Sequence, residues 1–184
     1  MNASEILSGL PKIAALVVGD ICLDHWCTYD PALSEPSRET GLPRIGVMGS
    51  YVSAGAGGTV ANNLVALKVY RVAVLGVFGD DGNGFELERA LQARGISVNL
   101  MLRDARLPTF TYTKFLNAET GIEDQPRVDF IPFRPLPEQM ERQIMTRLES
   151  AIGGFDVILV ADQAETEYGG VITPNVRQLL RKLA

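Results

Sequence analysis

Short apolar runs rich in β-branched residues alternate with amphipathic stretches along this chain, and this alternation constrains the fold more than any other feature. The runs cover residues 13–19, 72–78, 96–102 and 155–161. Each has the length of one strand, and its composition indicates burial on both faces, as in a parallel sheet. The sequence therefore predicts an α/β fold, with a mainly parallel sheet flanked by helices.

Three amphipathic stretches predict the flanking helices. One follows Pro137 and ends at 153–154, and another extends from Gly84 to Gly95. The third begins at Thr173-Pro174, a typical N-cap followed by proline at the first helical position. Their apolar stripes consist of Met140, Ile144, Leu148, Ala151 and Ile152, then Leu87, Ala90 and Leu91, then Val176, Leu179, Leu180 and Leu183.

The last predicted helix coincides with the end of the sequence at Ala184. A βα unit in a parallel sheet normally leads into another strand. We therefore expect residues 1–184 to be the N-terminal part of a domain that continues beyond Ala184. The alternative is an unusually small α/β domain closed by its last helix.

Two further segments predict a small antiparallel sheet outside the main one. Residues 109–114 alternate polar with aromatic or long side chains, and 127–131 resume a strand-like pattern after a polar turn. Residues 23–30 and 44–52 supply candidate partner strands. We expect this sheet to project as a lid formed by about 22–52 and 109–133.

Composition and charge exclude several classes of function. The formal net charge of −5 and pI of about 4.9 argue against binding to nucleic acid or anionic membranes. Cys22 and Cys27 lack zinc-site spacing and are expected to be free thiols. The N-terminus carries no secretory signal, and the uncharged segment 45–67 contains too many glycines for a membrane helix. These features predict a cytoplasmic protein.

Two carboxylates follow the first predicted strand, at the edge where open α/β sheets bind their ligands. Asp20 and Asp24 belong to the segment GDICLDHW. Each can accept hydrogen bonds from sugar hydroxyls, and each can instead cap a turn. His25 is too isolated for a catalytic triad or metal site, whereas Trp26 can pack or stack on a sugar.

A glycine-rich segment, SAGAGGTVANN at 53–63, leads directly into a helix. Gly57 and Gly58 allow close approach to the backbone, and the exposed amides of the first turn are hydrogen-bond donors. Asn62 and Asn63 add side-chain amides one turn later. A purely structural turn explains the same pattern.

The segment GVFGDDGNG, at 76–84, also follows a strand and opens a helix. Its spacing is GxxGxxGxG, which differs from the GxGxxG fingerprint of dinucleotide-binding proteins. Asp104 lies about 20 residues further on, but in a polar loop beyond the next strand, where it would be a poor ribose ligand. The sequence does not support NAD binding.

Together, the Gly-Asp strand end, the glycine pair with Asn62, GVFGDDGNG and the segments TFTYTKF and PRVDF resemble the N-terminal half of a PfkB or ribokinase-type carbohydrate kinase. The resemblance covers essentially all 184 residues. It is nearest to the heptose 7-phosphate kinase-like members, which have a similar GDxxLDxxW strand end. It implies a ribokinase-like fold and ATP-dependent phosphorylation of a sugar or sugar phosphate, with ATP and Mg²⁺ as cofactors.

The resemblance also implies roles for individual residues. Asp24 would bind hydroxyls of the acceptor sugar, Gly57 and Gly58 would place their backbone against it, and Asn62 would hydrogen-bond to it.

Four further residues receive roles in the same way. Lys114 and Arg127 would face the sugar from the lid, where either can hold a phosphate on the substrate; the alternative is that both are solvated surface cations. Asp162, in the loop after the last apolar run, would support the substrate site together with Gln163.

The sequence departs from the family pattern in two places. The family favours glycine near the end of the helix after Asn62, where this chain has Lys68, Val69 and Tyr70. The catalytic glycine-alanine-glycine-aspartate motif has no counterpart in these residues, so the catalytic residues are expected beyond Ala184. This chain would then supply the acceptor-sugar site and lid of the kinase.

A rival function is a non-catalytic sugar-binding or dimerisation module that lacks the nucleotide half. The exposed edge of a lid sheet favours pairing with a second copy, and we expect a homodimer formed through the lid.

Overall fold

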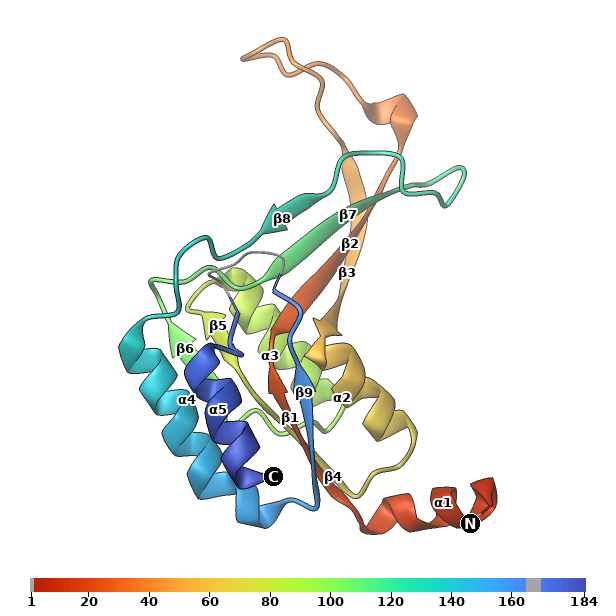
Figure 1. The fold of residues 1–184 in the computed structure, drawn as a ribbon. Helices are drawn as coiled ribbons and strands as arrows, with labels where there is room; N and C mark the ends of the chain where they lie inside the picture. The colour runs from red at the N-terminus through yellow and green to blue at the C-terminus, as the bar shows by residue number, and fades with distance from the viewer. Residues whose placement is uncertain (1, 165–169) are drawn as a thin grey trace.

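The computed structural model describes residues 2–164 and 170–184 and places a parallel sheet at the centre of the molecule (Figure 1). Strands β1 (Ala14–Gly19), β4 (Arg71–Leu75) and β9 (Val157–Ala161) are parallel and follow the order β4-β1-β9. A second parallel pair joins β5 (Val77–Gly79) to β6 (Leu102–Asp104). The predicted α/β class is confirmed.

Helices cover both faces of the parallel sheet. Side chains alternate along the central strand β1 and are buried on both sides, so each face needs a covering layer. Ala15 and Val17 of β1 lie in one buried cluster with side chains of α2 and α3. Leu16 and Val18 lie in a second cluster with side chains of α4 and α5. The helices are α2 (Gly57–Ala66), α3 (Gly82–Ala93), α4 (Glu138–Ala151) and α5 (Pro174–Leu183), with a short α1 (Ala3–Gly9) at the N-terminus.

Two helix ends show why the local sequence forms these elements. The Thr173 side chain accepts a hydrogen bond from the Val176 amide and caps α5, as predicted. After α2, the Val69 amide reaches back to the carbonyl of Leu64, which closes a Schellman turn. Lys68 takes the left-handed position of that turn, with φ of 63°, where glycine is favoured. The departure from the family pattern at Lys68 is therefore accommodated without loss of the turn.

A four-stranded sheet, called here the lid sheet, projects from one end of the body (Figure 1). Its order is β3-β2-β7-β8, and its strands are β2 (Ile21–Tyr29), β3 (Val47–Ala56), β7 (Thr111–Asn117) and β8 (Val128–Phe130). The prediction of a wholly antiparallel sheet is wrong, because β2 and β7 pair in parallel. Both strands leave the body at the carboxyl end of the parallel sheet, whereas β3 and β8 run back toward it.

Three of the apolar runs behave differently from the prediction, and one of them, 72–78, is divided at Gly76 into β4 and β5. In the run 96–102, regular strand begins only at Leu102, and Ile96 and Met101 are buried from an irregular segment. Strand β9 is not buried on both faces, since Val157 and Val160 are 40% and 49% exposed. Strand β9 lies at the edge of its sheet, where it pairs with β1 along one edge and with no described strand along the other.

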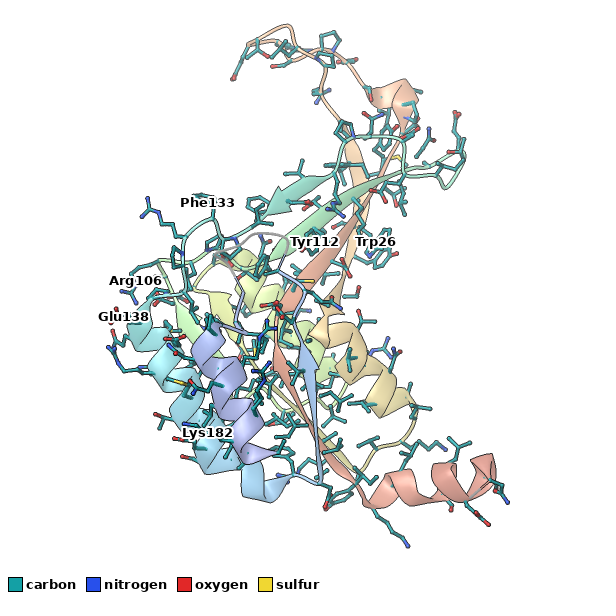
Figure 2. All side chains as sticks on the ribbon, in the orientation of Figure 1. Trp26, Arg106, Tyr112, Phe133, Glu138 and Lys182 are labelled. Carbon is teal, nitrogen blue, oxygen red and sulfur yellow. The ribbon has the colours of Figure 1, made fainter. Side chains whose placement is uncertain are left out.

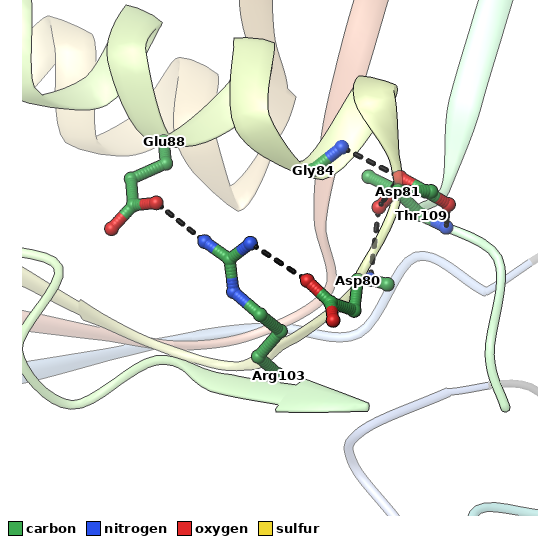
Figure 3. A network of polar contacts seen from close by, with 7 residues as sticks. Asp80, Asp81, Gly84, Glu88, Arg103 and Thr109 are labelled. Atoms are coloured by element: carbon green, nitrogen blue, oxygen red, sulfur yellow. Dashed lines mark hydrogen bonds and ion pairs between the residues drawn. The ribbon is translucent and has the colours of Figure 1, made fainter. Parts of the chain in front are cut away.

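The turn at 76–84 ties the body to the lid (Figure 3). The Asp81 carboxylate caps α3 by accepting from the Gly84 amide and also accepts from the amide and hydroxyl of Thr109, just before β7. Nearby, Arg103 pairs with Asp80 and with Glu88 of α3. This segment therefore anchors the first residues of the lid.

Within the described ranges, the helices are all too short or too polar to cross a lipid bilayer.

Candidate functional site

Polar and aromatic side chains gather on one face of the lid sheet. Side chains two residues apart share a face of a strand, so Asp24 and Trp26 of β2 point the same way. Their neighbours on that face follow from the register: Ser53 and Tyr51 in β3, and Tyr112 and Lys114 in β7. Figure 2 places Trp26 and Tyr112 on the lid, beyond the ends of the central strands. We call this surface the polar lid face.

Asp24, Lys114 and Trp26 form the centre of the polar lid face. The Lys114 ammonium lies 3.0 Å from Asp24 Oδ1 and 4.2 Å from the centre of the Trp26 ring. The side chains of Lys114 and Asp24 are only 17% and 20% exposed, so solvent screens this ion pair less than a surface pair. Tyr51, the β3 partner of Trp26, stacks against the Trp26 ring, and the two ring centres are 6.0 Å apart. The cation is thus held between a carboxylate and an aromatic face.

A second cation lies further along the same face. The Arg127 guanidinium sits 4.8 Å from the centre of the Tyr112 ring and donates to Asp129 Oδ2. Asp129 pairs with Tyr112 in the register between β8 and β7. Its other oxygen, Oδ1, is buried and has no hydrogen-bond partner among the described residues. The structure therefore brings Asp24, Lys114 and Arg127 onto one surface.

The start of α2 lies at the base of the polar lid face. Strand β3 ends at Ala56 and passes directly into the helix, and the Gly57 amide donates to the carbonyl of Asp20. A side chain on Gly57 would meet the Asp20 carbonyl and Ile21, and one on Gly58 would meet Ala54. Both glycines are needed for this close packing, whatever else their backbone binds.

Ala56 and Asn62 carry two further signs of constraint at this junction. Ala56 has φ of 52° and ψ of −122°, a conformation that is costly for a residue with a side chain. The amide nitrogen of Asn62 donates to the carbonyl of Ala54, while its Oδ1 is buried and has no partner among the described residues. An unsatisfied buried acceptor of this kind is available to a donor from a ligand.

Asp20 has a structural role in this fold. Its carboxylate is buried and accepts hydrogen bonds from the amides of Gln163 and Val171, both at 2.8 Å. Burial raises the pKa of Asp20, although these amide donors oppose the effect. Of the two readings left open by the sequence, the structure supports the capping role for Asp20.

The thiol of Cys22 lies among the charges of the site. Burial, followed by the nearby Asp24 carboxylate, raises its pKa to about 12, and the charges of Lys114 and Asp20 also act on it. Cys22 and Cys27 are both buried free thiols. At neutral pH the Cys22 sulfur is therefore a neutral packing group and not a nucleophile.

Asp162 lies at the carboxyl end of the parallel sheet, beside α5. It follows β9, is exposed, and pairs with Arg177 of α5 at 2.6 Å. Both residues line an apolar groove of about 640 Å³ between β9 and α5, together with Val157, Val160 and Leu180. The structure gives Asp162 no contact with Asp24, Lys114 or Arg127 among the interactions of the described residues. Gln163, which the sequence predicts to act together with Asp162, donates a hydrogen bond from its backbone amide to the Asp20 carboxylate.

Asp104 pairs with Arg106, two residues further along the chain. Hydrogen bonds from the Arg106 guanidinium and amide lower the pKa of Asp104 to about 2. Because the folded pKa lies below the unfolded one, this interaction stabilises the protein above about pH 4 and is lost as the pH falls toward 2.

We therefore expect the Asp104→Asn variant to lose less stability on acidification than the wild type. Urea unfolding between pH 5 and pH 2.5 measures this difference. Glu149→Gln, which removes an exposed charge from α4, is the matched control and should follow the wild type. Parallel pH dependence of Asp104→Asn and the wild type would contradict the assignment.

Sequence reasoning missed part of the polar lid face. Tyr51, Ser53, Tyr112 and Asp129 were not singled out, although the alternation along each strand was visible. That period places every second residue on one face, but the sequence does not give the register that brings four strands together. The sequence predicts that Trp26 packs or stacks on a sugar, and the structure places it beside Lys114.

The chemistry of the polar lid face suits a polyhydroxylated ligand. A carboxylate accepts hydrogen bonds from hydroxyls, an ammonium donates them, and aromatic rings cover the apolar face of a sugar. Over the described ranges, no group of three His, Cys, Asp or Glu side chains is arranged to hold a metal ion.

Comparisons with known proteins agree with this fold. The pfkB family carbohydrate kinase model matches residues 15–162. The Bifunctional protein HldE of Trichlorobacter lovleyi is 34% identical over 166 residues, which is 89% of this chain and 31% of that protein. Two solved structures share the fold: a carbohydrate kinase from Agrobacterium tumefaciens (TM-score 0.55, 19% identity, 80% of this chain and 45% of that one) and an Arabidopsis thaliana ribokinase complexed with ribose and ATP (0.50, 18%, 80% and 53%).

This chain thus spans about a third of the curated relative and about half of each solved structure. The family model covers most of its length, and the ribokinase-like fold predicted from the sequence is confirmed by the solved structures. The chain belongs to the pfkB family of carbohydrate kinases.

Proposed function

We propose that this chain supplies the acceptor-sugar site and lid of an ATP-dependent kinase that phosphorylates a hydroxyl of a sugar or sugar phosphate. The observation that carries the proposal is the partly buried cluster of Asp24, Lys114 and Trp26 beside the start of α2. Family membership and the ribose and ATP in the Arabidopsis ribokinase structure support the same reaction class.

In the proposed site, Asp24 accepts hydrogen bonds from two neighbouring hydroxyls of the acceptor, and Lys114 donates to a third oxygen. Trp26 and Tyr51 cover one face of the sugar ring. Arg127, further out on the polar lid face, is placed to bind a phosphate already on the acceptor. Asn62 Oδ1, buried without a partner among the described residues, is a further acceptor for a hydroxyl.

The transfer itself joins the acceptor oxygen to the γ-phosphorus of ATP, releases ADP and passes the hydroxyl proton to a base. We assign neither that base nor a Mg²⁺ ligand to residues of this chain. The resemblance to the family implies that ATP and Mg²⁺ bind in the remainder of such a kinase. In this scheme Asp162 is an auxiliary residue near the polar loop after β9.

Three further expectations belong to the same proposal. The protein works in the cytoplasm, it does not act on nucleic acid or membranes, and it forms a homodimer through the lid. The exposed side chains of Val47, Met48 and Tyr51 on β3, an edge strand of the lid sheet, favour pairing there.

The test combines binding and turnover. The purified chain is titrated in a calorimeter with D-ribose, D-fructose, D-fructose 6-phosphate and D-sedoheptulose 7-phosphate, and then incubated with each of them, ATP and Mg²⁺ while ADP is measured. We expect binding of at least one of these acceptors. ADP release that depends on the acceptor would show that the chain is itself active, and binding without ADP release would fit a chain that supplies only the acceptor site. Absence of binding by all four would contradict the proposal.

A further inference from the structure

Gly55 leaves open the space that the Asp24 carboxylate occupies. The residue lies in β3, opposite Cys22 and on the same face as Asp24. A Cβ atom at Gly55 would lie closer than 3.0 Å to Asp24 Oδ2 and Cγ, and 2.7 Å from Cys22 Sγ. Contacts at these distances do not occur, so a side chain at this position displaces the carboxylate.

Backbone conformation does not explain this glycine. The described glycines with positive φ are Gly19, Gly41, Gly95 and Gly121, and Gly55 has an ordinary strand conformation open to any residue. Space alone therefore distinguishes Gly55 from the other positions of β3.

The atoms that a side chain on Gly55 would meet belong to side chains and not to the backbone. A side chain on Gly57 would strike the Asp20 carbonyl, which is fixed backbone, and one on Gly58 would strike the buried Cβ of Ala54. At Gly55 the nearest atoms are the ends of two side chains, which can rotate away. A methyl group there should cost little stability and yet move the carboxylate.

We propose that Gly55 is a positioning residue of the acceptor site. Because it has no side chain, the Asp24 carboxylate has room to lie against the Lys114 ammonium, and this position sets the affinity for the acceptor hydroxyls. This inference rests on the proposed function. It concerns the geometry of the site, which can be observed without any sugar bound.

Trp26 gives a direct signal of that geometry, because it is the only tryptophan in the chain. Its ring lies 4.2 Å from the Lys114 ammonium, which is itself held by Asp24 at 3.0 Å. When the carboxylate moves, the ammonium loses its anchor and the charge beside the indole changes position. The emission of Trp26 therefore reports the position of the ion pair.

The experiment compares Gly55→Ala with Gly49→Ala. Gly49 lies in the same strand and, by the period of two, on the same face, and a Cβ there would meet nothing within 4 Å. Trp26 emission, urea unfolding and calorimetric affinity for the four acceptors named above are measured for both variants and for Asp24→Ala. We expect Gly55→Ala to remain folded, to change the emission as Asp24→Ala does, and to lower acceptor affinity about tenfold. Gly49→Ala should match the wild type in all three measurements.

The outcomes separate this inference from the proposed function. If Asp24→Ala weakens acceptor binding while Gly55→Ala leaves emission and affinity at wild-type values, the positioning role is wrong and the function stands. If neither variant changes affinity, or the wild type binds none of the acceptors, the proposed function fails, and the emission spectra still decide whether Gly55 positions the ion pair. Unfolding of Gly55→Ala would also overturn the inference, because Gly55 would then be required for the fold.

Discussion

Replacing Gly19 by alanine is expected to prevent the chain from folding. Gly19 ends β1 with φ of 136°, which residues with a side chain rarely adopt. A Cβ atom there would overlap the backbone carbonyl of Ala161 in β9, the strand that pairs with β1 at this position. Backbone strain and a clash with fixed backbone add, so the expected loss is about 4 kcal/mol or more of unfolding free energy.

Urea unfolding followed by circular dichroism measures this effect, together with the yield of soluble protein. Gly121→Ala is the matched control, because Gly121 also has positive φ, of 68°, but open space around its Cβ position. That variant should lose only about 1 kcal/mol. An unfolding free energy of Gly19→Ala within 1 kcal/mol of the wild type would contradict the close packing of β1 against β9.

The largest functional effect is expected for Asp24→Ala. The carboxylate is partly buried, anchors Lys114 and is the main acceptor for sugar hydroxyls in the proposed site. Hydrogen bonds to a charged group contribute about 1.5–3 kcal/mol, so loss of the carboxylate should weaken acceptor binding about 10- to 100-fold. Isothermal titration with the acceptor that the wild type binds most tightly measures the change.

The controls for this variant separate charge from position. Glu119→Ala removes an exposed carboxylate from the lid and should leave the affinity unchanged. Asp24→Asn keeps the shape of the side chain and loses its charge, and is expected to fall between the wild type and Asp24→Ala. If Asp24→Ala stays within about twofold of the wild type, roughly 0.4 kcal/mol, the role of this carboxylate is disproved.

The regular parts of the fold were predictable because their signals are local. Thr173 and Pro174 mark the start of α5, and the stripe of Met140, Ile144 and Leu148 marks the buried side of α4. The break at Gly76 was not predictable. It divides the run 72–78 into β4 and β5, and a side chain at Gly76 would approach the carbonyl of Gly19 at 2.6 Å, a contact across the sheet that local patterns do not reveal.

The site was predictable only in part, because it depends on contacts between residues far apart in the sequence. Asp24 lies a few residues after β1, a position that the sequence reveals, but its ion pair joins residues 90 positions apart. That contact depends on the parallel register of β2 and β7, whereas local patterns suggested antiparallel hairpins. Asp162 shows a second limit. Its position after a strand predicts a supporting role at the site, but that position does not reveal that its carboxylate pairs with Arg177 of α5.

The central claim is that the acceptor binds on the polar lid face beside the start of α2. A crystal structure of the chain with the acceptor that binds most tightly in calorimetry tests it directly. We expect density for the sugar within hydrogen-bonding distance of Asp24 and Lys114, with a ring face toward Trp26. Density in the groove between β9 and α5, with the Asp24–Lys114 pair intact and uncovered, would contradict it.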